Sequence, residues 1–435
     1  MLTRIPFAAM PSYRAVWRWH FYAGLYCVPF VLFLSVSGTL YLFQPEIEAW
    51  LDRPYSQLEI TGSTRSPAEI VQAAELAFPG SAFRFYEIPR TSQSAVQVVL
   101  LHEHSRLRTY LHPEKLKVLH SVREEDRFMR VVRHLHGELW LGENGSYLVE
   151  LAACWTLVLV LSGLYLWWPR NTKGVAGVLY PRLRLGSKVF WRDIHSVTGF
   201  WISPFILILI MTGLPWSKFW GEYFREVRKI TNTAPQRQSW STRSTFRDEP
   251  PAEGYNVLEL NRVIETVSNL HLDAPIQIAP PAGKSEAWTV QSMTANRPRR
   301  VTLAVNGQTG EVLSSHDFSH QHPIDKVVGV GIAFHEGQLF GWLNQVLGVL
   351  TTSALVTMCV SGVVIWWRRR QPGTLGAPAA TGDRRVSVAL LALVVFLGIA
   401  LPLFGISLIL VLLFERLFLS RIAGLKRWFG LPEPG

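Results

Sequence analysis

Cysteine and recognisable catalytic motifs are both scarce in this sequence. Three cysteines occur among 435 residues, and all three, Cys27, Cys154 and Cys359, fall within apolar runs. The sequence has no CxxC pair and no cysteine–histidine spacing typical of zinc sites, so we expect buried structural thiols. It also has no nucleophile elbow, phosphate-binding loop or dinucleotide fingerprint, which leaves no internal flavin or nicotinamide site to name.

Charge is scarce as well. Charged residues make up 17% of the chain, against roughly 25% in a soluble domain. Hydrophobic residues make up 49% and gather in runs of about 20, the length that crosses about 30 Å of hydrocarbon as a helix. We therefore predict a mainly α-helical polytopic membrane protein. Much of the net charge of +11 lies beside the apolar runs, so it indicates membrane orientation and lipid contact rather than nucleic-acid binding.

Four spans are predicted, at about 21–43, 147–168, 196–216 and 346–367. The short connections between spans are basic, with residues such as Lys173, Arg384 and Arg385, and basic short loops face the cytoplasm. The N-terminus is then cytoplasmic, the first span is a retained anchor, and the long polar regions lie in the periplasm of a bacterial inner membrane. The apolar tail is either one long helix or a hairpin closing at Pro402. We favour the hairpin, because it returns the last basic residues to the cytoplasm.

Each long polar region shows a small α+β pattern. The first has a helix signal, with Ser66 as the N-cap and Pro67 in the first turn, followed by strand-like runs at 95–101 and 107–111. The second region repeats this outline. It has a helical run at 257–270 and strand-like runs at 287–290, 300–305 and 311–313. We expect two small external modules.

The spans themselves repeat. His136 and His335 each lie 26 positions before a Ser-Gly pair and 32 before the second residue of a Trp-Trp pair. His20 and His195 each lie 18 positions before a glycine, with a proline between them. This tandem duplication predicts a symmetric four-helix membrane core whose two-fold pseudo-axis runs along the membrane normal. The predicted segments are 1–43, 44–145, 146–168, 169–195, 196–216, 217–343, 344–367, 368–385 and 386–435.

The duplication places one histidine pair near each membrane face, His20 with His195 and His136 with His335. A b-type haem needs two facing imidazoles, and glycines one turn after His20 and His195 would leave room for a flat ligand. The plainer alternatives are interfacial or helix-end histidines that the duplication copied, and Ser-Gly pairs that serve helix packing. His134 has no counterpart in the second half. It either ligates in place of His136 or caps the site.

A second group of histidines lies before the fourth span. His316, His320 and His322 allow a metal or iron-chelate contact, although solvated loop histidines are the simpler interpretation.

Several stretches together resemble the PepSY-associated transmembrane family. The resemblance is carried by WHFYAG at 19–24, HLHGEL at 134–139, WRDIHSVTG at 191–199, FHEG at 334–337 and the tail from LPLFG at 401–405 onward. It covers nearly the whole chain, and it implies that the external modules are PepSY-like.

The resemblance also implies a function. The family includes iron-regulated inner-membrane proteins, and some are ferric-siderophore reductases with two b-type haems. The family's histidines fall on His20, His136, His195 and His335 as haem-iron ligands, with His134 less certain. Some relatives carry a fused flavodoxin or ferredoxin-reductase module, so here we expect a separate cytoplasmic electron donor. We therefore expect an oxidoreductase that reduces a periplasmic ferric siderophore or other iron chelate. The alternatives are a non-redox accessory subunit or permease for siderophore uptake, and a PepSY-based regulator of a periplasmic peptidase.

Overall fold

The computed structural model describes residues 12–170, 174–234, 251–252, 254–283, 285–378, 388–419 and 421–430. Lys173, Arg384 and Arg385, which entered the topology prediction, lie outside the described residues. The chain divides into two compact units. We call Met1–Thr39, His134–Thr231 and Val346–Gly435 the helical unit, and Leu40–Arg133 with Asn232–Gln345 the sheet unit.

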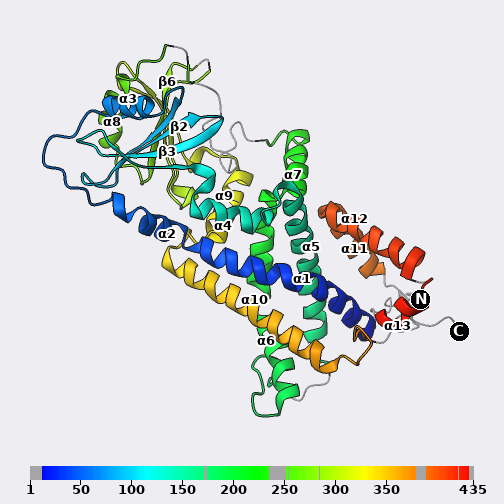
Figure 1. The fold of residues 1–435 in the computed structure, drawn as a ribbon. Coiled ribbons are helices and arrows are strands. Elements are labelled where there is room, and N and C mark those ends of the chain that lie inside the picture. Colours follow the sequence, from blue (N-terminus) through cyan, green and yellow to red (C-terminus); the bar gives the residue numbers. More distant parts are fainter. Residues whose placement is uncertain are drawn as a thin grey trace. The chain divides into compact units, whose positions relative to one another are not determined.

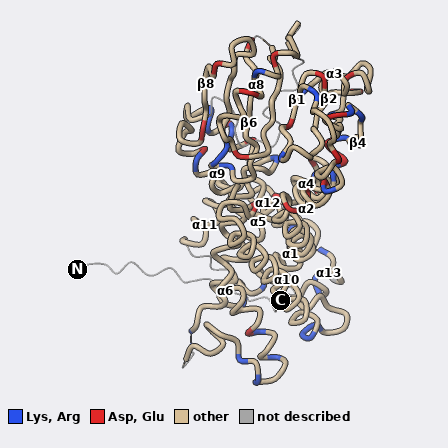
Figure 2. The backbone as a smooth tube through the Cα atoms, turned by 90° about the vertical axis from the view of Figure 1, so that its left-hand side faces the viewer, with Lys and Arg blue, Asp and Glu red and all other residues tan. Residues whose placement is uncertain are grey.

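Five helices in the described residues are long and apolar enough to cross a membrane. They are α1 (Tyr13–Leu42), α5 (Gly142–Trp167), α6 (Ser187–Gly213, extended to Trp216 by a 3-10 turn), α10 (Trp342–Arg369), and α12 (Pro402–Phe414) with a π-helical turn to Leu419. At 1.5 Å per residue the first four exceed the roughly 30 Å of a bilayer core. Figure 2 shows few charged residues along these helices. The prediction of a mainly helical, multi-pass membrane protein is confirmed.

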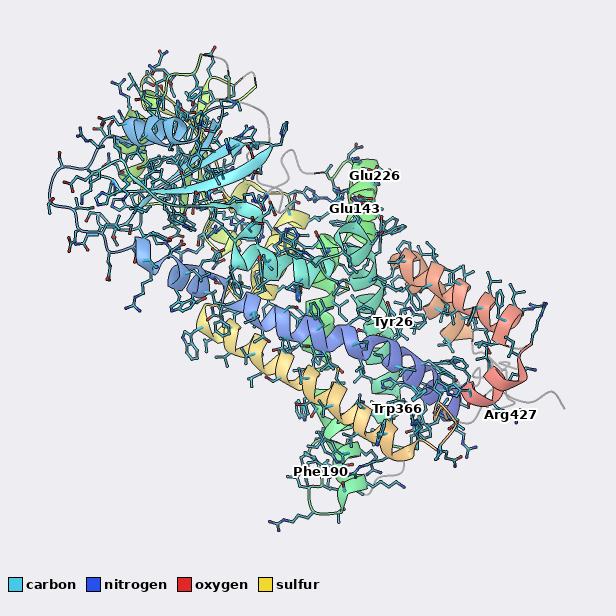
Figure 3. The ribbon with its side chains drawn as sticks, in the orientation of Figure 1. Tyr26, Glu143, Phe190, Glu226, Trp366 and Arg427 are labelled. Atoms are coloured by element: carbon cyan, nitrogen blue, oxygen red, sulfur yellow. The ribbon has the colours of Figure 1, made fainter. Side chains whose placement is uncertain are left out.

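The helices α1, α5, α6 and α10 are linked in a ring within the helical unit (Figure 1). Helices α5 and α6 share an apolar cluster that includes Cys154 and Ile206. On α1, the Thr39 hydroxyl donates to the Thr352 hydroxyl of α10 across 2.8 Å. The links from α1 to α5 and from α6 to α10 are made by histidines. Figure 3 marks Tyr26 on α1 and Trp366 on α10, and the three cysteines are buried free thiols among these helices.

The apolar tail bends at Leu401. Helix α11 (Val388–Ala400) ends there and α12 begins at Pro402, whose ring removes the backbone N–H that a continuous helix would need. The two helices lie side by side (Figure 1). A Cβ added at Gly405 would lie 2.9 Å from the Gly398 carbonyl oxygen, so only glycine allows this approach. The chain therefore turns at Pro402, as the hairpin alternative expects, although α11 is too short to count among the five spans.

Short helices complete the helical unit. They are α4 (Phe128–Glu138), α7 (Lys218–Ile230) and α13 (Ala423–Phe429), the first of which begins in the sheet unit. Glu150 of α5 is 1% exposed and accepts hydrogen bonds from the backbone N–H groups of Phe219 and Trp220, at 3.0 and 3.1 Å. These are free donors in the first turn of α7, where a helix favours negative charge. The buried carboxylate thereby fixes α7 onto α5.

The strands of both polar regions join in one eight-stranded antiparallel sheet, in the order β4-β3-β2-β1-β5-β6-β7-β8. The first region supplies α2 (Gln44–Leu51), α3 (Pro67–Ala77), β1 (Ala82–Glu87), β2 (Val96–His102), β3 (Ser105–Leu111) and β4 (Val118–Arg123). The second supplies α8 (Glu259–Ser268), β5 (Ile276–Ala279), β6 (Ala287–Ser292), β7 (Thr302–Asn306), β8 (Val312–His316) and α9 (Pro323–His335). Because β1 pairs with β5, the two expected modules share a single sheet.

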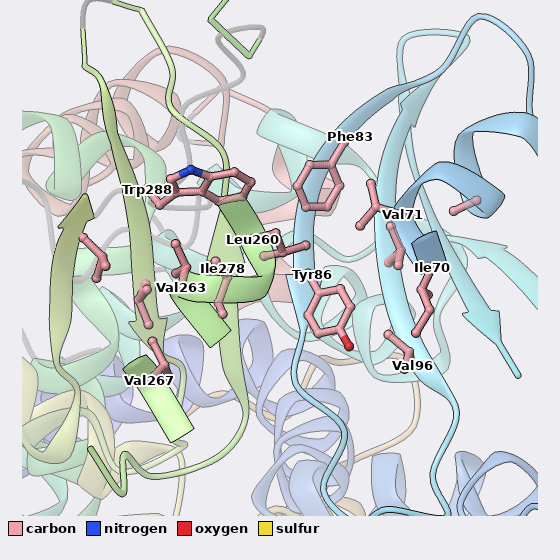
Figure 4. Close-up of a cluster of buried hydrophobic side chains, with 14 of the residues drawn as sticks. Ile70, Val71, Phe83, Tyr86, Val96, Leu260, Val263, Val267, Ile278 and Trp288 are labelled. Atoms are coloured by element: carbon pink, nitrogen blue, oxygen red, sulfur yellow. The ribbon is translucent and has the colours of Figure 1, made fainter. Parts of the chain in front are cut away.

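One face of this sheet packs against α3 and α8. Figure 4 shows Phe83 and Tyr86 of β1, and Ile278 and Trp288 of β5 and β6, in the same buried cluster as side chains from both helices. The repeat therefore builds one hydrophobic core from two copies of a helix followed by four strands. Ser66 caps α3 as predicted, accepting from the Glu69 backbone N–H while the Glu69 carboxylate accepts from the Ser66 N–H.

Candidate functional site

Two of the predicted histidines face each other inside the helical unit. His20 lies on α1 and His195 lies on α6. Their ring centres are 6.4 Å apart and their ring planes are nearly perpendicular, at 86°. His20 and His195, which the duplication predicted as a pair, are 175 positions apart in the sequence. The structure brings them together.

The ring of His20 is seated on α5. Its Nδ1 lies 2.9 Å from the Ser162 hydroxyl oxygen, and that hydroxyl donates to the Val158 carbonyl at 2.6 Å. The serine oxygen therefore accepts from Nδ1, and we infer a neutral tautomer whose Nε2 carries the free lone pair. A Cβ on Gly163 would lie 3.2 Å from His20 Cε1, so glycine makes room for the ring.

The ring of His195 is seated on α10 in the same way. Its Nδ1 lies 3.1 Å from the Met358 carbonyl oxygen and 3.1 Å from the Ser361 hydroxyl oxygen. A carbonyl can only accept, so Nδ1 carries the proton and Nε2 is again left with its lone pair. A Cβ on Gly362 would lie 3.4 Å from His195 Cε1. The second Ser-Gly pair thus repeats the function of the first.

A third histidine, His136, is also held by a Ser-Gly pair. In this case α1 provides the Ser-Gly pair, whereas for His20 it provides the histidine. His136 of α4 lies with its Nδ1 3.0 Å from the hydroxyl of Ser37, which donates to the Phe33 carbonyl of α1 at 2.9 Å. A Cβ on Gly38 would lie 3.0 Å from His136 Cε1. The Ser-Gly pairs were interpreted from sequence as helix packing. In the structure each of these three pairs holds an imidazole, but from a histidine 142, 166 or 99 positions away in the sequence.

His134 points elsewhere. Two positions apart on a helix, His134 and His136 project about 200° apart around its axis. His134 Nδ1 lies 3.1 Å from the Glu138 carboxylate and its ring lies edge-on to Trp140. It is His136, therefore, that occupies the seat on α1. His335 is the last residue of α9 in the sheet unit.

The two glycines expected to clear a slot instead face neighbouring side chains. The position for a Cβ on Gly24 is 3.8 Å from Leu159 Cδ2, and that on Gly199 is 3.2 Å from Met358 Cε. Each lies one turn along from its histidine and against the helix that seats it. An added Cβ at Gly199 would crowd Met358, whereas the distance at Gly24 is an ordinary van der Waals contact.

Opposite charges flank the pair two positions before each histidine. Arg18 donates to the carbonyls of Pro378, Gly430 and Phe429 at 2.7, 2.9 and 3.0 Å, which attaches the C-terminal segment to α1. Asp193 is fully buried and accepts from the side chains of Arg182 and Arg192 at 2.7 and 2.9 Å. The position two residues before the histidine is therefore charged in both halves, positive at Arg18 and negative at Asp193.

The sheet unit contains a cleft of about 2150 Å³ on the face opposite α3 and α8. His316, His320 and His322 all line it. His320 Nδ1 is 2.8 Å from Asp317, while His322 Nδ1 accepts from the Ile324 backbone N–H at the start of α9. Within the described residues no three histidine, cysteine, aspartate or glutamate side chains converge as a metal site. These histidines are therefore cleft-lining groups.

A helical membrane core in which Ser-Gly pairs hold His20, His195 and His136 defines a class of polytopic membrane protein that presents imidazoles between its helices. The sequence matches the family model of the PepSY-associated TM region over residues 17–369, from the start of α1 to the end of α10. The chain therefore belongs to the PepSY-associated transmembrane family. No curated protein shows a significant match to the sequence.

Proposed function

We propose that this protein is an inner-membrane oxidoreductase that holds two b-type haems and reduces a ferric siderophore or similar iron chelate on the periplasmic side. His20 with His195 would ligate one haem iron, and His136 with His335 would ligate the other. The observation that carries the proposal is the facing pair His20 and His195, each with Nδ1 engaged on a neighbouring helix.

The spacing of this pair would allow both imidazoles to hold one iron. A metal–imidazole bond is about 2 Å long. A ring nitrogen lies roughly 1.1 Å from the centre of a five-membered ring built from bonds of about 1.33 Å. Two imidazoles on opposite sides of one iron thus have centres about 6.2 Å apart, close to the 6.4 Å between His20 and His195.

The hydrogen bonds fit ligation as well. A metal-binding histidine characteristically donates its other ring N–H to a fixed acceptor, which sets the tautomer and orientation of the ring. Ser162, Ser361 with Met358, and Ser37 supply such acceptors to His20, His195 and His136. A haem held by these imidazoles would supply one-electron chemistry, which suits electron transfer across a membrane.

The reaction we propose consumes one electron for each ferric ion. A separate cytoplasmic donor supplies the electron, Fe(III) in the chelate becomes Fe(II), and no bond to the protein forms. Hard oxygen ligands hold the less charged ion more weakly, so reduction loosens the iron. The cleft of the sheet unit offers the docking place for the chelate.

An absorption spectrum of the purified full-length protein, oxidised and then reduced with dithionite, tests the proposal. We expect a Soret band and two haems per chain by haem extraction. His20→Ala and His195→Ala should each remove one haem, whereas His271→Ala should remove none, because His271 is exposed in the sheet unit. A well-folded protein without a Soret band would refute the proposal.

A further inference from the structure

A polar row crosses the whole sheet, and its members from Gln97 to His316 line the cleft. Residues directly opposed in neighbouring strands share a face. Successive strand pairs oppose one polar residue per strand, in the order His120, Tyr110, Gln97, Glu87, Gln277, Gln291, Thr302 and His316. Side chains of this row are bonded to one another, as where Gln277 Nε2 donates to Glu87 Oε2 at 3.1 Å. The part of the row that lines the cleft gives it a polar floor.

The cleft lining is rich in arginine. Nine arginines and no lysine line it, against seven aspartate and glutamate residues. Arginine presents a planar fork of donors that matches two oxygens at once, whereas lysine presents a single point charge. A lining that uses arginine alone is suited to recognising planar or bidentate oxygen anions. The nine are Arg84, Arg90, Arg106, Arg108, Arg127, Arg130, Arg133, Arg297 and Arg300.

Four of these arginines form a group that we call the arginine cluster: Arg130, Arg133, Arg297 and Arg300. Glu336 lies 3.3 Å from Arg297, and Glu124 lies 4.0 Å from Arg130. Glu124 is also shared with other arginines of the lining. These carboxylates balance part of the positive charge, and over the whole lining arginines outnumber carboxylates by nine to seven.

Arg300 shows this excess most clearly. Its hydrogen bond in the described structure runs from Nε to the Thr294 carbonyl at 2.8 Å, and no described carboxylate lies within ion-pair distance of it. Burial, and then the neighbouring charge of Arg297, together lower the pKa of Arg300 to about 10. Burial, and then Arg130, lower the pKa of Arg133 in the same direction. Each cation is destabilised where it stands and would be stabilised by an added anion.

We infer that the arginine cluster binds an anionic ferric chelate, one whose outer carboxylate or catecholate oxygens give the complex a net negative charge. This inference rests on the proposed function and names the class of its substrate. A simple inorganic anion would fill a small part of a cleft of about 2150 Å³. A whole chelate fits that space, with the arginine forks meeting its outer oxygens and the polar row beneath it.

Calorimetric titration of the full-length protein in detergent, without an electron donor, tests the inference. The probes are ferric citrate, iron-free citrate and a ferric trihydroxamate of zero net charge. We expect ferric citrate to bind most tightly, with an affinity that falls as salt rises. Arg300→Gln should weaken it about tenfold to a hundredfold, the range for losing one charge-assisted hydrogen bond, and Arg300→Lys should weaken it less.

Arg299→Gln is the matched control. Arg299 is the neighbouring residue, but it is exposed, lies outside the cleft lining and pairs with Asp273 at 2.8 Å. Its substitution should leave ferric citrate binding unchanged. Equal binding of the neutral trihydroxamate or of iron-free citrate, or an unaltered affinity in Arg300→Gln, would overturn the inference. Haem absorption in the same samples separates the two proposals. Haem with no chelate binding refutes the substrate class alone, and selective binding without haem refutes the oxidoreductase alone.

Discussion

Replacing Ser162 by alanine tests how the histidines are held. The change removes the acceptor 2.9 Å from His20 Nδ1 and leaves a polar N–H among apolar helices. An unsatisfied buried donor costs about 1–3 kcal/mol. Loss of the group that orients a metal-binding histidine weakens metal binding by roughly 10–100-fold. We therefore expect Ser162→Ala to lower the thermal stability of the haem-free protein and to weaken haem retention.

The matched control is Thr357→Ala on α10. The Thr357 hydroxyl donates to the Ser353 carbonyl at 2.9 Å, just as the Ser162 hydroxyl donates within its own helix, but it is exposed and seats no ring. It should change stability by less than about 0.5 kcal/mol.

A double-mutant cycle completes the test. If Ser162 acts through His20, its substitution should cost little once His20→Ala is present, with a coupling of about 1 kcal/mol or more. Thermal unfolding in detergent gives the four stabilities, and haem extraction gives the occupancy. Strictly additive effects, or equal losses in Ser162→Ala and Thr357→Ala, would refute the seating role of Ser162.

Three further predictions follow from single positions. Gly38→Ala places a Cβ 3.0 Å from His136 Cε1 and should cost about 1–3 kcal/mol in thermal unfolding, whereas Gly137→Ala, with no atom within 4 Å, should cost nothing. Burial raises the pKa of Glu124, but the charge of the neighbouring arginines, Arg108 first among them, outweighs burial and holds that pKa at about 2. The Glu124 carboxylate should therefore contribute about 3 kcal/mol to the free energy of unfolding above pH 4.5, and this contribution should be lost as pH falls toward 2. Thermal unfolding of Glu124→Gln should lack this pH dependence. Ser66→Ala removes a capping box and should cost about 1 kcal/mol in the same assay.

The spans could be located from sequence because hydropathy is a local property. The predicted span at 147–168 and the observed α5, Gly142–Trp167, differ by five residues at the start and by one at the end. Helices continue past the apolar stretch where polar residues reach the membrane surface. The cap at Ser66 was equally local, since all its partners lie within three positions.

The sheet was harder to predict because its central pairing is not local. Strand β5 has four residues, too few for a clear alternation, and its partner β1 lies nearly 200 positions earlier. Strands β1, β4 and β5 were not predicted at all, and the joining of two modules in one sheet depends on them. Nothing within either repeat indicates that its first strand pairs with its counterpart.

The facing of His20 and His195 could be predicted from the sequence, but the side chains that hold their rings could not. Repetition alone singled out His20 and His195. The Ser-Gly pairs were assigned to packing because their contact to the imidazoles spans 142 and 166 positions. The choice between His134 and His136 also needed the structure, since only the direction of the helix face decides it.

The seating of the histidines also bears on how such a protein arises. Ser162 seats His20 and Ser37 seats His136 within the first half of the chain, and Ser361 seats His195 within the second. The facing of His20 and His195, by contrast, joins one half to the other. An ancestral half-length chain would already have held its imidazoles in place, and two copies of it, related by a two-fold axis, would have formed the pair. Fusion of the two copies would then have allowed them to diverge, which accounts for Arg18 before one histidine and Asp193 before the other.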